Sequence, residues 1–294
     1  MNKKFLESLK AYVFIGPFVI LSGAFMIYPV FQGFIRSVYN SKWNRTVFVG
    51  LENYKKIFSN DVYLLSIKNS LLFVLVVVPL LIVFGIWIGG SIFDKKPLYV
   101  SSVRACLYIP VIASMVVMSI IWRFILDSQT GLVRYFTMVL GYDKAPNILA
   151  DRTWTLVLLM IILFTMNIGQ TVLLYVADMI GISRDLIEAC RIDGGSRLDL
   201  FCYVLVPLTM PTTILTFITQ TSAVLKVFVV IQLLTKGGPN YGTTTMMYLL
   251  YQDAFENRDT GTASAMGVLM FMISLILISM RFVAMSRERK EKGL

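Results

Sequence analysis

The side chains with the most chemical potential in this sequence are neutral hydrogen-bonding groups inside long apolar stretches. Asn167, Gln170 and Thr171 follow the three- and four-residue spacing that places side chains on one face of a helix, and Thr216 and Gln220 repeat that spacing later. Amide side chains are costly in hydrocarbon without partners. They either join neighbouring helices by hydrogen bonds or line a polar cavity that binds a neutral, hydroxyl-rich solute. The residues alone leave both interpretations open.

Acid–base and metal chemistry have little support in the residues. The chain has no histidine, which is the commonest general base and metal ligand. Cys106, Cys190 and Cys202 are scattered without metal-ligand spacing, so we interpret them as small core residues. No clustered pair of carboxylates lies within an apolar stretch, which argues against a membrane enzyme. We therefore expect no catalytic residue and no metal site.

The apolar stretches that carry these groups are long enough to cross a membrane. Of the 294 residues 57% are hydrophobic and only 15% are charged, whereas a water-soluble domain has about a quarter charged. A transmembrane helix needs about 20 apolar residues. We predict an all-α membrane protein with six transmembrane helices. The six stretches without charge are 11–35, 69–93, 105–122, 153–177, 200–225 and 260–280.

The spans have no ionisable residue near their middle. Proton- or sodium-coupled carriers usually hold a buried ionisable group there, so this absence argues against such a carrier. A secondary carrier or facilitator that works without an ATPase stays the first alternative, and a membrane enzyme the second.

The positive charges indicate how the chain is oriented. The net charge is +10, and the basic residues lie between apolar spans, which suits contact with membrane lipid better than nucleic acid. They are denser in the segments that lie inside if both termini are cytoplasmic, so we predict that topology for a multi-pass protein of the cell (inner or plasma) membrane. The predicted divisions are a cytoplasmic N-terminus 1–10, a transmembrane domain 11–285 and a cytoplasmic basic tail 286–294.

The segment 178–199, between the fourth and fifth spans, has the signals of a short helix. Ser183 is a suitable N-cap, and Asp185 places a carboxylate in the first turn, near the positive end of the helix. Gly194 and Gly195 suit the C-terminal end, where a left-handed residue is favoured.

A second helix is predicted directly after the glycines. Ser196 caps it, with Asp199 three residues on as the partner in a capping box. Ala189 and Cys190 give the first helix a small face that another surface could approach closely. The predicted design is a helix, a glycine hinge and a second helix exposed to cytosol.

An outer segment also has helical periodicity. In 51–58, apolar residues recur at helical spacing with two lysines between them, which predicts a short amphipathic helix. The apolar residues are Leu51, Tyr54, Ile57 and Phe58.

The inner loop resembles a known family at fixed positions. Glu188-Ala189-Cys190, then Gly194, then Val204-x-Val206-Pro207 resembles the EAA loop of ATP-binding-cassette (ABC) importer permeases, whose pattern is EAA-x3-G-x9-I-x-LP. The spacing matches throughout. Cys190 replaces the second alanine, and two valines replace isoleucine and leucine.

Two further stretches resemble the carbohydrate permeases of the maltose and glycerol-phosphate type within that family. The segment 234–239 (LTKGGP) with Thr243–Thr245, Tyr251, Ala254 and Phe255 resembles their LTxGGP…T…Y…AF pattern. Tyr28-Pro29 with 48–54 (FVGLENY) resembles their first segment.

The resemblance implies a type I ABC importer permease fold with a cytoplasmic coupling helix, and it implies partners. In such importers two permeases form a heterodimer, a cytoplasmic ATPase dimer receives the coupling helices, and an external binding protein delivers the solute. Glu188 would face basic groups of the ATPase, and Gly194 would let the helix pivot. The implied ATPase-coupling residues are Ser183, Asp185, Ile187, Glu188, Ala189, Cys190, Asp193 and Gly194.

The chain itself is predicted to be a transport subunit and not an enzyme. It has no G-x4-GK[ST] phosphate loop, so ATP would be bound by the partner subunit and the chain needs no cofactor. The family places part of its sugar site on spans four and five, which makes the neutral polar residues candidate substrate-pathway residues. They are Asn167, Gln170, Thr171, Thr216 and Gln220. An oligosaccharide, a monosaccharide, glycerol phosphate or a uronate would all fit this scaffold. No basic residue lies in spans four or five, which favours a neutral sugar over an anionic solute.

Overall fold

In the computed structural model, residues 3–42, 45–142 and 147–291 are described. The chain divides into two units, which we describe separately. The first joins residues 1–60 to 249–271, and the second joins 61–248 to 272–294. Both are built almost entirely from helices, as predicted.

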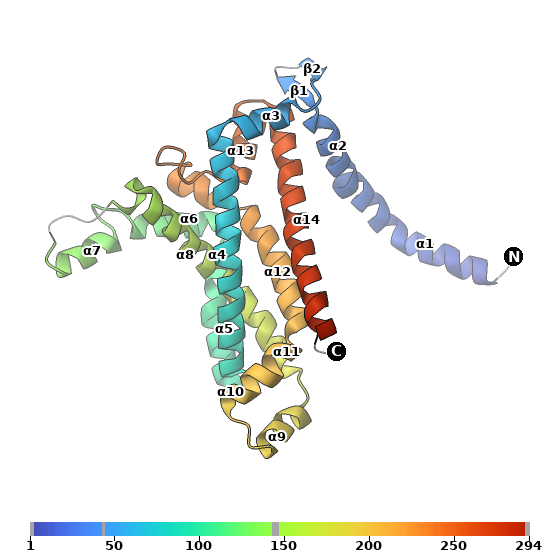
Figure 1. Ribbon diagram of the computed structural model, residues 1–294, viewed down its shortest axis with the longest axis vertical. Coiled ribbons are helices and arrows are strands. Elements are labelled where there is room, and N and C mark those ends of the chain that lie inside the picture. The colour runs from blue at the N-terminus through green and yellow to red at the C-terminus, as the bar shows by residue number, and fades with distance from the viewer. Residues whose placement is uncertain (1–2, 43–44, 143–146, 292–294) are drawn as a thin grey trace. The chain divides into compact units, whose positions relative to one another are not determined.

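The first unit begins with an apolar helical segment and a small hairpin (Figure 1). Tyr12–Ser37 is long and apolar enough to span a membrane, and none of its most apolar window is buried. The hairpin pairs Tyr39 with Phe48 in antiparallel register and was not predicted. The elements are α1 (Lys3–Ser22), η1 (Gly23–Ile27), α2 (Tyr28–Ser37), β1 (Tyr39–Lys42), β2 (Arg45–Phe48), α3 (Glu52–Ser59), η5 (Gln252–Glu256) and the first part of α14 (Thr260–Glu291).

The predicted amphipathic helix is present as α3, but a different face is buried. Leu51 and Phe58 are exposed, while Asn53 and Ile57 are buried. Hydrogen bonds explain why Asn53 faces inward: its side-chain amide donates to the Ser37 carbonyl (2.8 Å) and to the Tyr39 carbonyl (2.9 Å). These bonds satisfy backbone oxygens at the end of α2 and the start of β1, and so fix which face of α3 is buried.

An ion pair joins α3 to the start of α14 within this unit. The Lys56 ammonium lies 2.8 Å from the Asp259 carboxylate and donates also to the Thr262 hydroxyl (3.0 Å). The Asp259 side chain is 5% exposed. Burial raises the pKa of Asp259, but hydrogen bonds from Lys56 and Thr262 outweigh it and hold the pKa below its usual value.

The second unit is a bundle of long helices. α4 packs against α8 and α12, and α5 packs against α8. Figure 1 shows α9 beyond the lower ends of α4, α5 and α12. The elements are α4 (Asp61–Ile92), α5 (Pro97–Ile112), α6 (Met115–Ile125), α7 (Leu132–Val139), η2 (Ile148–Ala150), α8 (Arg152–Ile180), α9 (Arg184–Ile192), α10 (Arg197–Asp199), η3 (Leu200–Leu205), α11 (Val206–Leu208), α12 (Met210–Leu225) and η4 (Ile231–Thr235). α13 (Met246–Tyr251) leads into the first unit.

Each of the six predicted spans falls on helix, but two of them fall on bent helix pairs. Over the described residues four helices are long and apolar enough to cross a membrane, and six spans result if each of two bent pairs counts as one. The third span bends by 94° between α5 and α6. The break falls at Ala113, which is extended, and at Ser114, whose hydroxyl caps α6 by accepting from the Val117 amide. Pro110 lies inside α5 and not at the break. The break is therefore better explained by the Ser114 N-cap of α6 than by the proline.

The fifth span bends by 63° between α11 and α12. Thr209 lies at the bend, between Pro207 and Pro211. A proline removes an amide donor and its ring crowds the carbonyl four residues earlier, which for Pro211 is that of Pro207. The Leu205 carbonyl accepts from both the Thr209 amide (3.0 Å) and the Thr209 hydroxyl (2.9 Å), so the residue at the bend stays bonded to the preceding turn.

Small residues allow the bundle helices to approach closely. At Gly85 and Gly89 of α4 an added Cβ would lie 2.8 and 3.1 Å from Tyr175 atoms of α8. At Gly169 of α8 it would lie 2.1 Å from the Leu107 carbonyl oxygen of α5. Glycine is therefore required at these crossings, as in other membrane helix pairs.

The predicted boundaries at the two ends do not coincide with helix ends. α1 already begins at Lys3, and α14 continues as helix to Glu291. Charged residues stop an apolar run without stopping a helix, because helix hydrogen bonds are made in water too. For the same reason α4 begins at Asp61, well before the predicted 69.

Candidate functional site

The helix predicted in the inner loop is present as α9, with both predicted caps. The Ser183 hydroxyl accepts a hydrogen bond from the Asp185 amide (3.3 Å). At the other end the Gly194 amide donates to the Arg191 carbonyl and the Gly195 amide to the Cys190 carbonyl (2.9 Å). Gly194 has φ +79°, so the end is a Schellman cap with glycine in the left-handed position. The helix is therefore a defined unit of nine residues.

α9 has an inner and an outer face. Ile187 and Cys190 are partly buried against a cluster formed by Tyr175, Met179, Leu200 and Leu205. The outer face exposes two acidic residues, a small residue and two large apolar ones. These residues are Asp185, Leu186, Glu188, Ala189 and Ile192, the last 85% exposed.

The predicted coupling residues therefore divide between the two faces. Glu188 and Ala189 are available to another surface, whereas Cys190 points inward and Ile187 anchors the helix. Asp193 is exposed at the C-cap, before the left-handed Gly194. Cys190 is thus not part of the small outer face that the sequence suggested, because the helix turn carries it to the cluster. The interpretation of the three cysteines as core residues suits Cys190 alone, because Cys106 and Cys202 are exposed.

The second predicted helix is also capped as expected. The Asp199 carboxylate accepts from the Ser196 amide (2.8 Å), and the Ser196 hydroxyl accepts from the Asp199 amide (3.2 Å). This capping box begins α10, which continues through η3 and α11 to the bend at Thr209. The loop therefore continues into the fifth span as helix.

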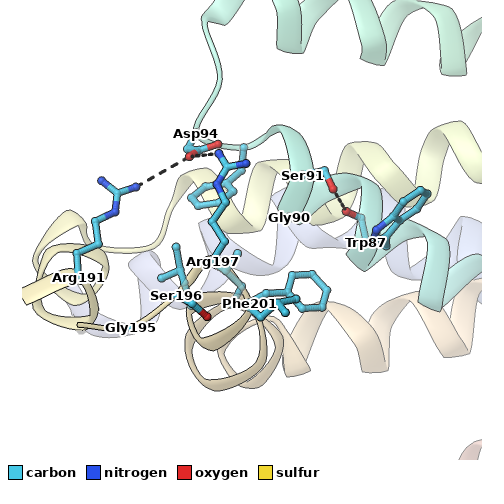
Figure 2. A pocket seen from close by; sticks show the side chains of 13 residues that line it. Trp87, Gly90, Ser91, Asp94, Arg191, Gly195, Ser196, Arg197 and Phe201 are labelled. Atoms are coloured by element: carbon cyan, nitrogen blue, oxygen red, sulfur yellow. Dashed lines mark hydrogen bonds and ion pairs between the residues drawn. The ribbon is translucent and has the colours of Figure 1, made fainter. Parts of the chain in front are cut away.

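A carboxylate that the sequence did not single out lies against this loop. Asp94 follows the end of α4, and Figure 2 shows it between Arg191 and Arg197. Its Oδ2 lies 3.4 Å from Arg197 Nη2 and 4.0 Å from Arg191 Nη2. The three residues line a cavity of about 350 Å³ together with Trp87, Gly90 and Phe201. No spacing in the sequence links Asp94 to the loop, because the contact spans 103 residues.

The polar side chains of the fourth and fifth spans meet in one place, inside the bundle. Gln220 of α12 donates from Nε2 to the Thr171 hydroxyl of α8 at 3.4 Å, and both residues are buried. Among the described residues no hydrogen-bond partner reaches Gln220 Oε1, Thr216 Oγ1 or Thr221 Oγ1, all of which are buried. Buried polar atoms without partners require an explanation such as water or a bound solute.

The remaining two predicted pathway residues lie differently. Asn167 is half-buried and its amide donates to the Leu163 carbonyl of its own helix (2.7 Å), while Gln170 is exposed. The expected common face is thus split, with Thr171 inside and Gln170 outside. A stripe of residues at this spacing covers about 100° of the helix circumference, so residues at its two edges can face different neighbouring elements.

Tyr175 connects the polar residues to the loop, and sequence reasoning missed it. Its ring is fully buried, and its hydroxyl donates to the Thr213 hydroxyl of α12 (2.9 Å). It stands one helix turn from Thr171 and belongs to the cluster that supports α9. A tyrosine inside an apolar stretch carries no signal that separates it from ordinary core.

The Gly-Gly-Pro segment is a tightly held turn. Lys236, Asn240 and Tyr241 have positive φ, and Thr243 is fully buried. The Asn69 amide of α4 donates to the Gly242 carbonyl and to the Thr244 carbonyl, each at 2.9 Å. The segment is thus fixed to the second span, which explains why an amide is placed in an apolar stretch.

A bundle of apolar helices that encloses uncharged polar groups and carries a capped loop helix defines a polytopic membrane permease. The sequence matches the family described as "Binding-protein-dependent transport system inner membrane component" over residues 47–292, and the chain belongs to that family. It is the transmembrane permease subunit of an ABC importer, an inner-membrane component whose ATPase is a separate subunit.

Curated relatives match nearly the whole length of the chain. It is 26% identical to the lactose transport system permease protein LacF of Rhizobium radiobacter, over 97% of this chain and 98% of that protein. It is 27% identical to the sn-glycerol-3-phosphate transport system permease protein UgpA of Pectobacterium atrosepticum, over 95% of each.

A solved structure shows the same fold. One chain of a bacterial alginate ABC transporter, in complex with an alginate pentasaccharide-bound periplasmic protein, superposes with a TM-score of 0.79 at 19% identity. The superposition covers 95% of this chain and 94% of that one. The predicted type I importer permease fold is therefore confirmed.

Proposed function

We propose that this permease imports a neutral sugar, which an external binding protein delivers, and that it works with a second permease and a cytoplasmic ATPase dimer. In this proposal the outer face of α9 docks on the ATPase, both termini lie in the cytoplasm, and ATP is bound only by the partner. The observation that carries the proposal is the two-faced, doubly capped α9 at the EAA position.

The outer face of α9 suits a protein groove. Glu188 and Asp185 supply negative charge, Ala189 permits close approach, and Leu186 and Ile192 supply apolar area. Interfaces combine an apolar centre with charged groups that set orientation. The capping residues Ser183 and Gly194 keep this face helical without the partner.

The interior supports a neutral, hydroxyl-rich cargo. Gln220, Thr216 and Thr171 offer hydrogen bonds without charge, and no ionisable residue lies in Met210–Leu225. A phosphate or carboxylate would favour a cationic partner, which this interface lacks. Lactose transport by a relative agrees with a neutral sugar, while the glycerol-phosphate relative makes an anionic solute the competing outcome.

The second permease has a surface available to it. Over residues 12–37, which cover the end of α1, η1 and α2, most apolar side chains are exposed, including Phe14, Phe18 and Phe25. Lipid or another set of apolar helices must cover them in a membrane. A heterodimer partner would cover part of this area.

The test is gentle extraction of the chain from its native membrane, followed by mass spectrometry of what accompanies it. We expect an ATPase with a phosphate loop and a second six-span permease. With Glu188→Lys the chain should stay in the membrane but lose the ATPase and the uptake of solute, because the changed charge opposes basic groups on the ATPase. Glu256→Lys, the same change at an exposed position outside α9, is the control and should lose neither.

Two results would overturn the proposal. Normal ATPase retention and uptake by Glu188→Lys would remove the coupling role of α9. Solute movement in vesicles by the isolated chain, without ATP, would replace the importer by a facilitator. Competition of uptake by a neutral disaccharide and by glycerol phosphate then decides the cargo, and inhibition by the anion alone would reject the neutral sugar.

A further inference from the structure

We propose that Asp94 is a positioning residue that holds the two arms of the coupling loop at a fixed angle and ties them to the end of α4. The inference rests on the proposed coupling role of α9. It adds a residue outside the EAA loop, in the segment between the second and third spans.

The first support is geometric. Arg191 lies in the last turn of α9, before the glycines, and Arg197 opens α10, after them. One carboxylate oxygen of Asp94 faces both guanidinium groups, at 4.0 and 3.4 Å (Figure 2). The carboxylate therefore bridges the Gly194–Gly195 turn on the side of α4.

The second support is that the turn itself leaves the angle weakly determined. Glycine lowers the cost of changing backbone conformation, and Gly194 already lies in the left-handed region. Beside the turn lies the cavity of about 350 Å³ between α4, α10 and η3, so neighbouring atoms do not fill the space into which the loop would move. Ile187 and Cys190 restrain the inner side of the loop by packing on the cluster that contains Leu200 and Leu205, and the charged contact restrains the side of the cavity.

The third support is the position of Asp94 in the bundle. Its side chain is only 27% exposed, whereas Arg191 and Arg197 are 58% and 75% exposed. The Asp94 end of α4 is fixed, because Gly89 of the same helix packs against Tyr175 and Met179 of α8. The two arginines are thus the more exposed partners and Asp94 the more buried one, so displacement of α9 by an ATPase would pass to the end of α4 through this contact.

The first test measures the restraint itself. Arg191 and Arg197 are trypsin sites, and cleavage follows the population of the opened loop when opening is rapid. In the detergent-solubilised full chain, Asp94→Asn should speed cleavage after both arginines about fivefold. A factor of about five corresponds to the loss of one of the stronger exposed ion pairs. Cleavage after Arg258, which lies outside the loop, is the internal reference for trypsin activity. Lys95→Gln removes a charge next to Asp94 and is the control variant, which should leave cleavage after the two arginines unchanged. Unchanged cleavage at the two arginines would overturn the proposal.

The second test measures coupling in the complete complex with its ATPase. Asp94→Asn should keep the ATPase bound, because the outer face of α9 is untouched, and should lower solute imported per ATP hydrolysed about fivefold. Arg197→Gln removes one of the two contacts of Asp94 and should also lower the ratio. The double variant should be no worse than Asp94→Asn alone, because that variant already weakens both contacts. Faster cleavage with an unchanged import ratio would reject the positioning role.

The Glu188→Lys variant separates the two proposals. If it keeps the ATPase, the coupling assignment of α9 is wrong, whatever Asp94 does. If it loses the ATPase while Asp94→Asn leaves cleavage and the import ratio unchanged, α9 is the coupling helix and only the Asp94 inference fails.

Discussion

Gln220 shows how one side chain can serve both interpretations that its sequence position allows. Its amide nitrogen joins α12 to α8 through Thr171, while its carbonyl oxygen has no partner among the described residues. A residue used only to join helices would leave no buried acceptor without a partner, since such an acceptor costs about 1–3 kcal/mol. Gln220 is therefore both a helix contact and an open hydrogen-bonding position.

We predict that Gln220→Leu raises the KM for solute uptake about fivefold, the effect of one lost hydrogen bond of about 1 kcal/mol. The ATPase should stay bound, and the amount of protein in the membrane should not change. Uptake kinetics in vesicles measure this. Thr219→Val is the control, because Thr219 is exposed and bonds to its own helix. An unchanged KM with reduced protein would show that Gln220 only joins helices.

Asp259 makes a second prediction at this scale, on stability and pH. Its folded pKa is lowered, so its carboxylate stabilises the fold above the unfolded pKa of about 3.9, and that contribution is lost as pH falls through the folded value. Asp259→Asn should cost about 1–2 kcal/mol at neutral pH through the weakened bond to Lys56.

The measurement is thermal unfolding in detergent of Asp259→Asn and the unmodified chain between pH 3 and 7. The difference between them should shrink below about pH 4. Glu256→Gln, at an exposed position, should behave like the unmodified chain. A difference that stayed constant down to pH 3 would show that the Asp259 charge is not the cause.

Among the elements, α9 is the one that local sequence determines most completely. Its N-cap, its glycine cap and the following capping box are all interactions between residues at most five apart. Such interactions depend on spacing alone, and they were predicted correctly. Which side of the helix is buried depends on Tyr175 and Met179, and the sequence left Cys190 open between the core and a small exposed face.

The crossing of α5 and α8 gives a prediction for an element pair. Gly169→Ala would place a methyl group against the Leu107 backbone, and backbone cannot move aside as a flexible side chain can. Overpacking of this kind costs about 1–3 kcal/mol. We expect a lower thermal unfolding temperature and less protein in the membrane. Gly33→Ala in α2 is the control, since an added Cβ there meets nothing within 4 Å. If Gly169→Ala unfolds at the same temperature as the control, the close crossing of α5 and α8 is contradicted.

The two bent spans show where element prediction fails. The apolar runs 105–122 and 200–225 have the length of straight spans, yet the structure breaks both. Hydropathy reports that a segment prefers hydrocarbon, and it says little about whether its helix is continuous. The prolines were visible in the sequence, but at the third span the break came at Ser114 because its hydroxyl could cap a new helix.

For the molecule as a transporter, the second unit contains a continuous series of contacts from the loop to the interior. Ile187 and Cys190 of α9 contact the cluster that contains Met179 and Tyr175. Tyr175 donates to Thr213 of α12 and stands one helix turn from Thr171, which belongs to the polar pair. Packed networks of this kind can carry coupling between sites, although contact by itself does not demonstrate it. The import-ratio measurements on Asp94 and the KM measurement on Gln220 test its two ends.

The sequence by itself determined the helical class, the number of apolar spans, the capped loop helix and the types of polar side chains. Each depends on composition or short spacing, because hydrocarbon requires long helices and caps act within a turn or two. Only the tertiary structure decided that Thr171 meets Gln220 while Gln170 faces outward, and that Asp94 lies between Arg191 and Arg197. Those contacts join residues about 50 to 100 positions apart, so they follow from how the helices cross, and helix crossing is set by packing of whole faces.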